Sequence, residues 1–318
     1  MQFYVARRLL LMIPTLLGVT FIVFVMVRAV PGDVIDLLTG DFGAASEETK
    51  AALRKEYQLD DNIVVQYVKW IGRVARFDFG NSILSDRTVI SELKSRLPVT
   101  LELGILAIIC SLCIALPVGI MSAIRQDTAW DYAGRSFAIG LLAIPGFWVG
   151  IILITMAGRY FTWGVPPKDY IAFTDNPLGN LRMMIVPSMI LGAGLSGSVM
   201  RFTRSAMLET LRQDYIRTAR AKGLPQRRVV GVHALRNALL PIVTVIGPSL
   251  AFLVTGSFVV ESLFAIPGVG YLGVQAIAQR DYPVIQGTTV VLAVAVVAMN
   301  LVTDILYTVL DPRIKVES

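Results

Sequence analysis

Few residues of this 318-residue sequence are spaced so that they could carry out chemistry. Cys110 and Cys113 form a Cys-x-x-Cys pair, a spacing found in redox and metal sites. The pair stands alone within an apolar stretch, so we interpret both residues as small apolar side chains in a packed core. The one histidine, His233, has no cysteine or carboxylate cluster nearby in the sequence. We therefore expect no metal site.

Motifs for nucleotide chemistry are weak or missing. Gly268 to Gly273 reads GVGYLG and fits G-x-G-x-x-G, but no strand is expected before it, so we interpret its glycines as turn and packing residues. The phosphate-binding pattern G-x-x-x-x-G-K-[ST] does not occur, and no nucleophile stands beside a base. The sequence therefore predicts no enzyme and no cofactor in this chain.

The composition indicates a membrane protein. The chain is 55% hydrophobic and 16% charged, with a mean hydropathy of +0.65, whereas soluble domains average about 25% charged residues. Six stretches of 18 to 23 residues contain no Asp, Glu, Lys or Arg, and each is long enough to cross about 30 Å of hydrocarbon as a helix. We predict an all-α protein with six transmembrane helices at 9–27, 103–124, 136–158, 183–200, 238–260 and 283–303.

The basic residues predict the orientation. Fifteen Lys and Arg residues fall on one side: two in the N-terminal segment, two at 125–135, nine at 201–236 and two in the tail. Four fall in the short loops of the other side. Because positive short loops stay in the cytoplasm, we place both termini there. The net charge of +6 then needs no nucleic acid to explain it.

The spans divide the chain into four parts. The first is a transmembrane helix (1–30), which is too long for the apolar core of a cleaved signal peptide. An extracytoplasmic helical element (31–98) follows, with a helix predicted from Ser46 to Leu59. The rest is a five-helix core (99–310) and a cytoplasmic tail (311–318).

The core contains a long basic loop at 201–236, with nine Lys and Arg residues and two acids. Its composition predicts a helix over 214–222, which Gly223 ends, and a second helix that starts near Gln226 and runs through His233 toward the fifth span. Ala219 and Gly223 lie four residues apart, so they would let another surface approach closely. Anchoring of helix ends at lipid phosphates is the alternative interpretation.

This loop resembles the cytoplasmic EAA loop of ABC-importer permeases, in the form found in the dipeptide, oligopeptide and nickel branch. The family's E-A-A-x-x-x-G falls on Arg217, Thr218, Ala219 and Gly223, with the Glu and the first Ala replaced. The following Leu240-Pro241 comes later than in the general pattern. Both departures are usual in the peptide branch, which tends to read YxRTARAKG and then HALRNALLP, here at 215–223 and 233–241. Further matches are VPGD (30–33), DFGNS (78–82), RFTRSAMLE (201–209), IPGVG (266–270), RDYPVIQG (280–287) and DPRI (311–314).

The resemblance implies a type I ABC-importer permease fold in the bacterial inner membrane. It implies as partners a second homologous permease, two ATP-binding cassette subunits that bind the ATP, and an extracytoplasmic substrate-binding protein, with no nucleic acid. In that family the loop docks on the ATPase, and the coupling residues carried over are Tyr215, Arg217, Thr218, Ala219, Lys222 and Gly223.

The fourth span contains two pairs of small residues spaced four apart, Gly192 with Ser196 and Gly194 with Ser198. Such pairs suit close helix packing. The alternative is that they line the translocation path.

Three acids near span ends, Glu102, Glu261 and Asp304, could contact a charged peptide terminus or anchor a span end at the membrane interface, which we favour. Peptides of two or more residues are the expected solute. Glutathione or nickel chelates are alternatives within the same architecture. An ATPase-independent secondary transporter or channel is the alternative from another class, although the acidic and basic residues lie near the span ends and are absent from the span centres.

Overall fold

The structure, a computed structural model, describes residues 2–29, 61–85, 87–160 and 170–310. These residues form helices joined by turns, and their only β-pairing is an isolated bridge between Asn81 and Thr88. The helices are α1 (Gln2–Ala29), α4 (Ile63–Val74), α5 (Val89–Ile124), α6 (Ala129–Ala143), α7 (Gly146–Tyr160), α8 (Pro177–Leu211), α9 (Asp214–Ala221), α10 (Gln226–Arg228), the π-helical turn η1 (Val229–Ala234), α11 (Leu235–Leu263), α12 (Val269–Gln279) and α13 (Tyr282–Leu310). The all-α prediction is confirmed.

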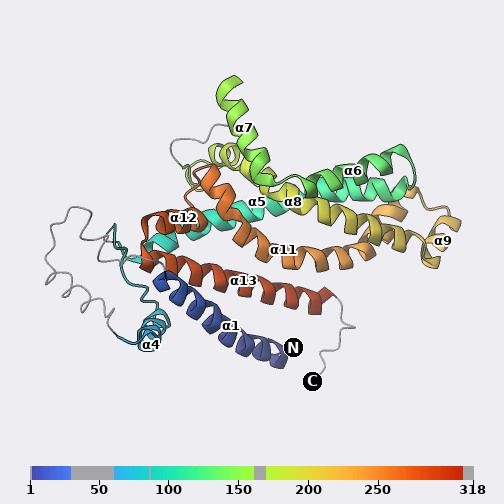
Figure 1. Cartoon of the computed structure of the whole chain (residues 1–318). Helices are drawn as coiled ribbons and strands as arrows, with labels where there is room; N and C mark the ends of the chain where they lie inside the picture. Colours follow the sequence, from blue (N-terminus) through green and yellow to red (C-terminus); the bar gives the residue numbers. More distant parts are fainter. Residues whose placement is uncertain (1, 30–60, 86, 161–169, 311–318) are drawn as a thin grey trace.

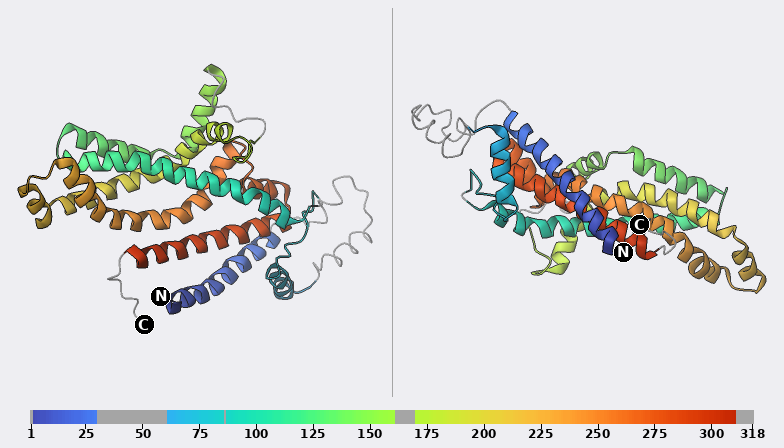
Figure 2. Two further views of the ribbon diagram at one scale, coloured as in Figure 1. Left: turned by 180° about the vertical axis from the view of Figure 1, so that it is seen from behind. Right: turned by 90° about the horizontal axis from the view of Figure 1, so that it is seen from below.

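The long helices α5, α8, α11 and α13 run alongside one another in one bundle (Figure 1). The start of α1, the start of α6, helix α9 and the end of α13 gather at one end of this bundle (Figures 1 and 2). Helices α4 and α12 and the start of α5 lie at the other end. This is the grouping that the basic residues predict, whereas the side of the membrane on which each end lies stays a prediction.

Within the part of the chain that the structure describes, four helices are long and apolar enough to cross a membrane: the apolar part of α1 (Leu10–Ala29), α5, α8 and the apolar part of α13 (Tyr282–Ile305). The count rises to five if α6 and α7 together form one span. The predicted fifth span, 238–260, lies within α11, some of whose side chains are outside the described set. The predicted total of six is therefore neither confirmed nor contradicted.

The predicted third span, 136–158, is not one continuous helix. Helices α6 and α7 meet at a bend of 88°. Ile144 has an extended backbone (φ −92°, ψ 120°) because Pro145 follows it, and proline disfavours the helical conformation in the residue before it. Helix α7 consequently projects away from the bundle (Figure 1).

Two other predictions concern where helices begin. Helix α5 begins at Val89, inside the segment that we assign to the extracytoplasmic element, and continues without a break into the second span. The helix predicted from Ser46 to Leu59 lies outside the described residues.

Glycines bring α5, α6 and α8 into close contact. A Cβ added at Gly192 of α8 would lie 2.4 Å from the carbonyl oxygen of Ala107 in α5. One added at Gly197 would lie 2.7 Å from the carbonyl oxygen of Ala138 in α6. Real Cβ atoms do not approach a backbone this closely, so these positions need glycine.

The buried residues of α5 recur every four positions, at Leu103, Ala107, Ser111, Ala115 and Gly119. This stripe faces the neighbouring helices. Cys110 is half-buried and Cys113, which lies opposite the stripe, is exposed. The prediction of a packed core position is therefore wrong for Cys113.

Candidate coupling surface and translocation path

Helix α9 forms where the basic loop predicts a helix. It begins at Asp214, ends at Ala221 and is followed by Gly223, which has the left-handed backbone conformation (φ 76°). The N–H of Leu224 then donates to the carbonyl oxygen of Ala219 across 3.3 Å, which closes the helix end. The predicted helix and its glycine stop are confirmed.

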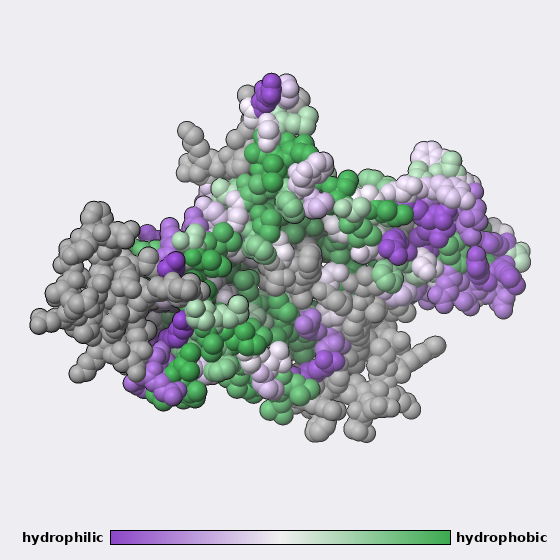
Figure 3. Space-filling model, in the orientation of Figure 1, coloured by the Kyte–Doolittle hydropathy of each residue, from purple (hydrophilic) through white to green (hydrophobic). Residues whose placement is uncertain are grey.

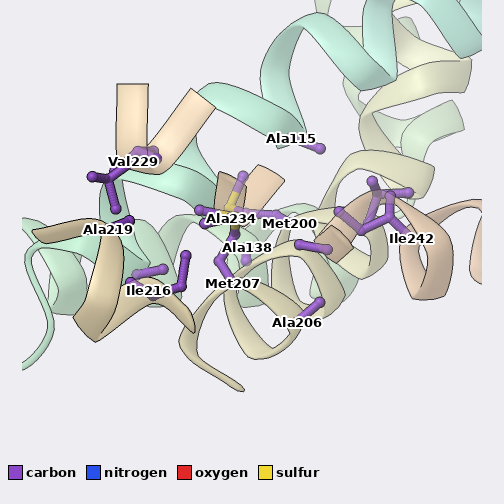
Figure 4. Close-up of a cluster of buried hydrophobic side chains, with 14 residues drawn as sticks. Ala115, Ala138, Met200, Ala206, Met207, Ile216, Ala219, Val229, Ala234 and Ile242 are labelled. Carbon is purple, nitrogen blue, oxygen red and sulfur yellow. The ribbon is translucent and has the colours of Figure 1, made fainter. Parts of the chain in front are cut away.

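The inner face of α9 is anchored to the bundle. Ile216 and Ala219 are buried, and they join a cluster that includes Met207 of α8 and Val229 and Ala234 of η1 (Figure 4). The same cluster extends to α5, α6 and α11. Ala219 therefore faces this chain's own core, and it does not present its side chain to another surface as the sequence suggested.

The outer face of α9 is exposed and cationic. The predicted coupling residues Tyr215, Arg217, Thr218, Lys222 and Gly223 are all exposed, as are the neighbouring Arg220, Arg227 and Arg228. Figure 3 shows the hydrophilic side chains that gather at this end of the molecule. A Cβ added at Gly223 would meet nothing within 4 Å, so the turn after α9 is open to an approaching surface.

Contacts along this face fix its shape. The Arg217 guanidinium lies 3.2 Å from the Asp214 carboxylate. The side-chain N–H of Asn237 donates to the Tyr215 hydroxyl across 2.9 Å, which links α9 to the first turn of α11. The buried face of α9 and the hydrogen bond between Tyr215 and Asn237 therefore both hold this exposed helix in place.

The second predicted helix begins at Gln226, as expected, and runs through α10 and η1 into α11. The π-helical turn between them was not predicted. A π turn holds one more residue per turn than an α-helix, and such turns occur often at functional sites. Nothing in the sequence of η1, VVGVHA, distinguishes it from an ordinary helix.

An ion pair beside α9 was also missed. The Arg204 guanidinium of α8 donates two hydrogen bonds of 2.7 Å to the carboxylate of Asp131, which is fully buried at the start of α6. Ser122 of α5 donates to the same carboxylate, and so does the backbone N–H of Asp127 (3.0 Å). The pair connects α5, α6 and α8 at the end that carries α9. Its residues stand far apart in the sequence and belong to no recognisable spacing.

The two small-residue pairs of α8 lie on opposite faces of that helix. Gly192 and Ser196 are buried, Gly192 against α5, and the Ser196 hydroxyl donates to the Gly192 carbonyl oxygen (2.8 Å). Gly194 is exposed, with nothing within 4 Å of an added Cβ, and Ser198 is half-buried. Only the first pair packs helices in this chain.

Gly194 lines a crevice with a volume of about 220 Å³ at the bend between α6 and α7. Its other walls are apolar and include Phe137, Ile144, Val149 and Ile190. The crevice lies in the angle that the helix break at Pro145 opens between α6 and α7.

The three acids have different surroundings. Asp304 of α13 lies 3.2 Å from Arg8 of α1, at the end of the bundle where α1 begins. Tyr170 donates its hydroxyl to Glu102 (3.0 Å), and burial together with this bond raises the pKa of Tyr170 to about 12. Neither acid is free to act as a simple solvent-exposed charge.

Glu261 is fully buried, so the expectation that it anchors a span end at the membrane interface is wrong. Its carboxylate accepts hydrogen bonds from Thr100 of α5 (2.9 Å), Ser257 of α11 (3.0 Å) and the N–H of Tyr271 (3.0 Å). The last of these lies in the first turn of α12, where unpaired N–H groups favour a carboxylate. Glu261 thus joins three helices.

The GVGYLG stretch contributes packing glycines, as expected. A Cβ at Gly268 would lie 2.3 Å from the Glu261 carboxylate, and one at Gly270 would lie 2.5 Å from Phe258. Among the residues that the structure describes, no three His, Cys, Asp or Glu side chains form a group that could hold a metal ion.

These features define a helical protein of the membrane in which one end of the bundle presents a short, basic, firmly packed helix. Residues 115–316 match the family described as "Binding-protein-dependent transport system inner membrane component", and residues 1–104 match the N-terminal domain that accompanies it. The chain belongs to this family. It is therefore a component of a transport system in the inner membrane, as the resemblance implies, and not an enzyme.

Relatives cover nearly the whole chain. A putative peptide transport system permease protein of Brucella abortus (strain 2308) is 40% identical over 311 residues, 98% of either chain. The oligopeptide transport system permease protein AppB of Bacillus subtilis (strain 168) is 42% identical over 317 residues, 99% of this chain and 100% of its own length. The dipeptide transport system permease protein DppB of Escherichia coli (strain K12) is 37% identical over 336 residues, 98% of either chain.

Proposed function

We propose that this chain is the permease subunit of an ATP-driven importer of di- or oligopeptides. A second homologous permease completes the translocation path, two ATPase subunits bind the ATP, and a substrate-binding protein delivers the solute from outside. The names of the relatives, which refer to peptide, oligopeptide and dipeptide transport, support the choice of solute.

The observation that carries the proposal is the two-sided character of α9. Its outer face, with Tyr215, Arg217, Thr218, Lys222 and Gly223, is free to meet an ATPase subunit, whereas Ile216 and Ala219 fix its inner face to the bundle. A helix packed in this way transmits a displacement because a close-packed interior does not absorb it. The cationic outer face suits an acidic groove on the partner.

For the translocation path we propose the opposite face of α8. Gly194 opens to the apolar crevice at the α6–α7 bend, and Ser198 lies one turn further along the same face. Gly192 and Ser196 support this face indirectly, because their packing against α5 sets the position of α8. Because the crevice is apolar and the residues beside it are small, it suits peptide side chains of varied shape.

The test of coupling is Gly223→Trp, with Gly223→Asn as the matched control. Tryptophan adds bulk where the partner would approach, whereas asparagine keeps the left-handed conformation at low cost. We expect Gly223→Trp to insert into the membrane normally but to lose peptide uptake and its link to ATP hydrolysis. Normal uptake by this variant would refute the coupling role, and uptake without any ATPase subunit would favour a secondary transporter.

The solute is tested by uptake in a deletion strain that carries the chain with its partner subunits. Labelled dipeptides, longer peptides, glutathione and nickel chelates are compared. We expect di- or oligopeptides to be taken up, and import of glutathione or nickel alone would replace the peptide assignment while leaving the architecture intact.

A further inference from the structure

Helix α4 has two chemically different flanks beside its packed face. Trp70 is buried in a small cluster with Phe24 of α1 and Val290 of α13. Val64 and Val68, one turn apart, lie on one flank, and Lys69 and Arg73, also one turn apart, lie on the other. The exposed surface of α4 is therefore itself divided into an apolar flank and a basic flank.

Contacts with α1 show which way each flank faces. Gln66, on the basic flank, accepts a hydrogen bond of 2.8 Å from Arg28, one residue from the end of α1. Tyr67, on the packed face toward the apolar flank, lies 2.9 Å from the Thr20 hydroxyl and donates to the Leu17 carbonyl oxygen (2.9 Å). Leu17 lies about 16 Å before Arg28 along the helix. The apolar flank therefore faces the middle of the span and the basic flank faces its end.

The course of α4 agrees with this orientation. In Figure 1 it is seen nearly end-on at the end of α1, whereas α5, α8 and α13 run across the picture, so α4 lies across the direction of the long helices. Figure 3 shows hydrophilic side chains at the outer edge of α4 and hydrophobic ones beside them, toward the middle of the molecule.

The apolar flank is exposed within the chain. Val64 and Val68 are 54% and 60% exposed. Phe21 of α1, which is 39% exposed, lies edge-on against Tyr67 with ring centroids 5.1 Å apart, and as a membrane span α1 meets hydrocarbon at this level. The exposed valines of α4 lie on the flank next to Tyr67 and continue this apolar surface at the level where the span ends.

The turn after α4 also indicates that this part of the chain lies at the boundary between lipid and water. Phe77 has a left-handed backbone (φ 61°), held by a hydrogen bond of 3.0 Å from the N–H of Asp78 to the carbonyl oxygen of Arg73. This position normally takes glycine, because bulky residues are strained there. The Phe77 side chain is nevertheless 76% exposed, and aromatic side chains are typical of the boundary between lipid and water.

From these contacts we infer that α4 lies in the boundary between headgroups and acyl chains of the bilayer, at the end of α1 remote from its N-terminus. Acyl chains cover Val64, Val68 and Phe77, and lipid phosphates meet Arg73, whereas the neighbouring Lys69 pairs with Asp61 (2.8 Å). Interfacial amphipathic helices take this position, with their apolar side chains among the acyl chains and their basic side chains at the headgroups. The inference does not depend on the solute or on the ATPase partners.

Nitroxide labels on single cysteines test this placement in the full chain. The background carries Cys110→Ser and Cys113→Ser, and the labels are attached at Val68→Cys and, as the matched control on the opposite flank, at Arg73→Cys. The protein is placed in vesicles of phosphatidylethanolamine and phosphatidylglycerol. Collision rates are measured with oxygen, which concentrates in lipid, and with a water-soluble nickel chelate.

We expect the ratio of oxygen to nickel collisions to be several-fold higher at Val68→Cys than at Arg73→Cys. Adding Phe77→Gly should lower the ratio at Val68→Cys, because it removes the aromatic anchor while keeping the turn. Equal ratios on the two flanks would overturn the inference. So would shielding of Val68→Cys that occurs only when a soluble substrate-binding protein is added, because a protein would then be the occupant.

Discussion

Substitution of Ile216 by alanine tests how α9 is held. The helix has eight residues, and an isolated helix of that length is marginal in water. Its apolar attachment comes from the two side chains that it buries, Ile216 (0% exposed) and Ala219 (7% exposed), beside the exposed hydrogen bond between Tyr215 and Asn237. Truncating a buried isoleucine to alanine costs about 2–5 kcal/mol, whereas the single methyl of Ala219 contributes about 0.8 kcal/mol. Ile216 therefore supplies most of the attachment.

Hydrogen exchange of the amides of 214–222 measures this loss in the purified chain without ATPase subunits. A cost of 2 kcal/mol corresponds to about 30-fold, so Ile216→Ala should lower the protection of these amides by at least about 30-fold, up to the limit set by the protection of the parent chain. With the ATPases present, peptide uptake per ATP hydrolysed should fall, because a loosely held helix absorbs the displacement.

The control is Arg217→Ala, the neighbouring residue on the exposed face. Its ion pair with Asp214 is exposed to solvent, and such pairs contribute little to stability. We expect protection to change only slightly while binding of the ATPase subunit weakens. Unchanged exchange in Ile216→Ala, or an equal change in both variants, would refute the idea that the buried face of α9 anchors it.

Two further predictions concern the bundle, both measured by thermal unfolding in detergent. Gly192→Ala should lower the unfolding temperature, because its Cβ would lie 2.4 Å from a backbone oxygen. Gly194→Ala should leave the unfolding temperature unchanged or raise it, because alanine stabilises a helix by about 1 kcal/mol relative to glycine. A shift of the same sign at both positions would contradict the packing argument. Arg204→Met should destabilise by up to about 3–5 kcal/mol, because it removes the bidentate partner of the buried Asp131 carboxylate and leaves only the longer contact to Arg135 (3.5 Å). Adding Asp131→Leu should recover part of the loss, and an additive double variant would contradict a direct pair.

Sequence alone predicted the features that local patterns determine. Runs without charge predicted the long apolar helices, and composition with the Gly223 stop predicted α9 almost to the residue. A left-handed glycine and a proline impose their effect on the adjacent backbone, so their consequences can be read without knowing the fold. Pro145 carried the same kind of signal, and the bend of the third span could have been expected from it.

Features that depend on how helices meet could not be predicted. Glu261 stands near the end of an apolar run, which suggests an interface anchor, but its position is set by Thr100 and by the first turn of α12. Asp131 and Arg204 are 73 residues apart, and only the packing of α6 on α8 brings them together. Likewise, Ala219 fits a docking face by spacing alone, and the structure turns it inward.

The glycine contacts determine which helices can move with α9. Gly192 and Gly197 bring α8 against the backbones of α5 and α6, where no flexible side chain can adjust, and the Asp131–Arg204 pair adds a buried ionic link. Helix α9 begins three residues after α8 ends, so a displacement of α9 acts directly on α8. With 35 residues, α8 is about 52 Å long and carries that displacement across the bundle. We therefore expect α5, α6, α8 and α9 to move as one body, and relative motion to occur where side chains separate them from α1 and α13.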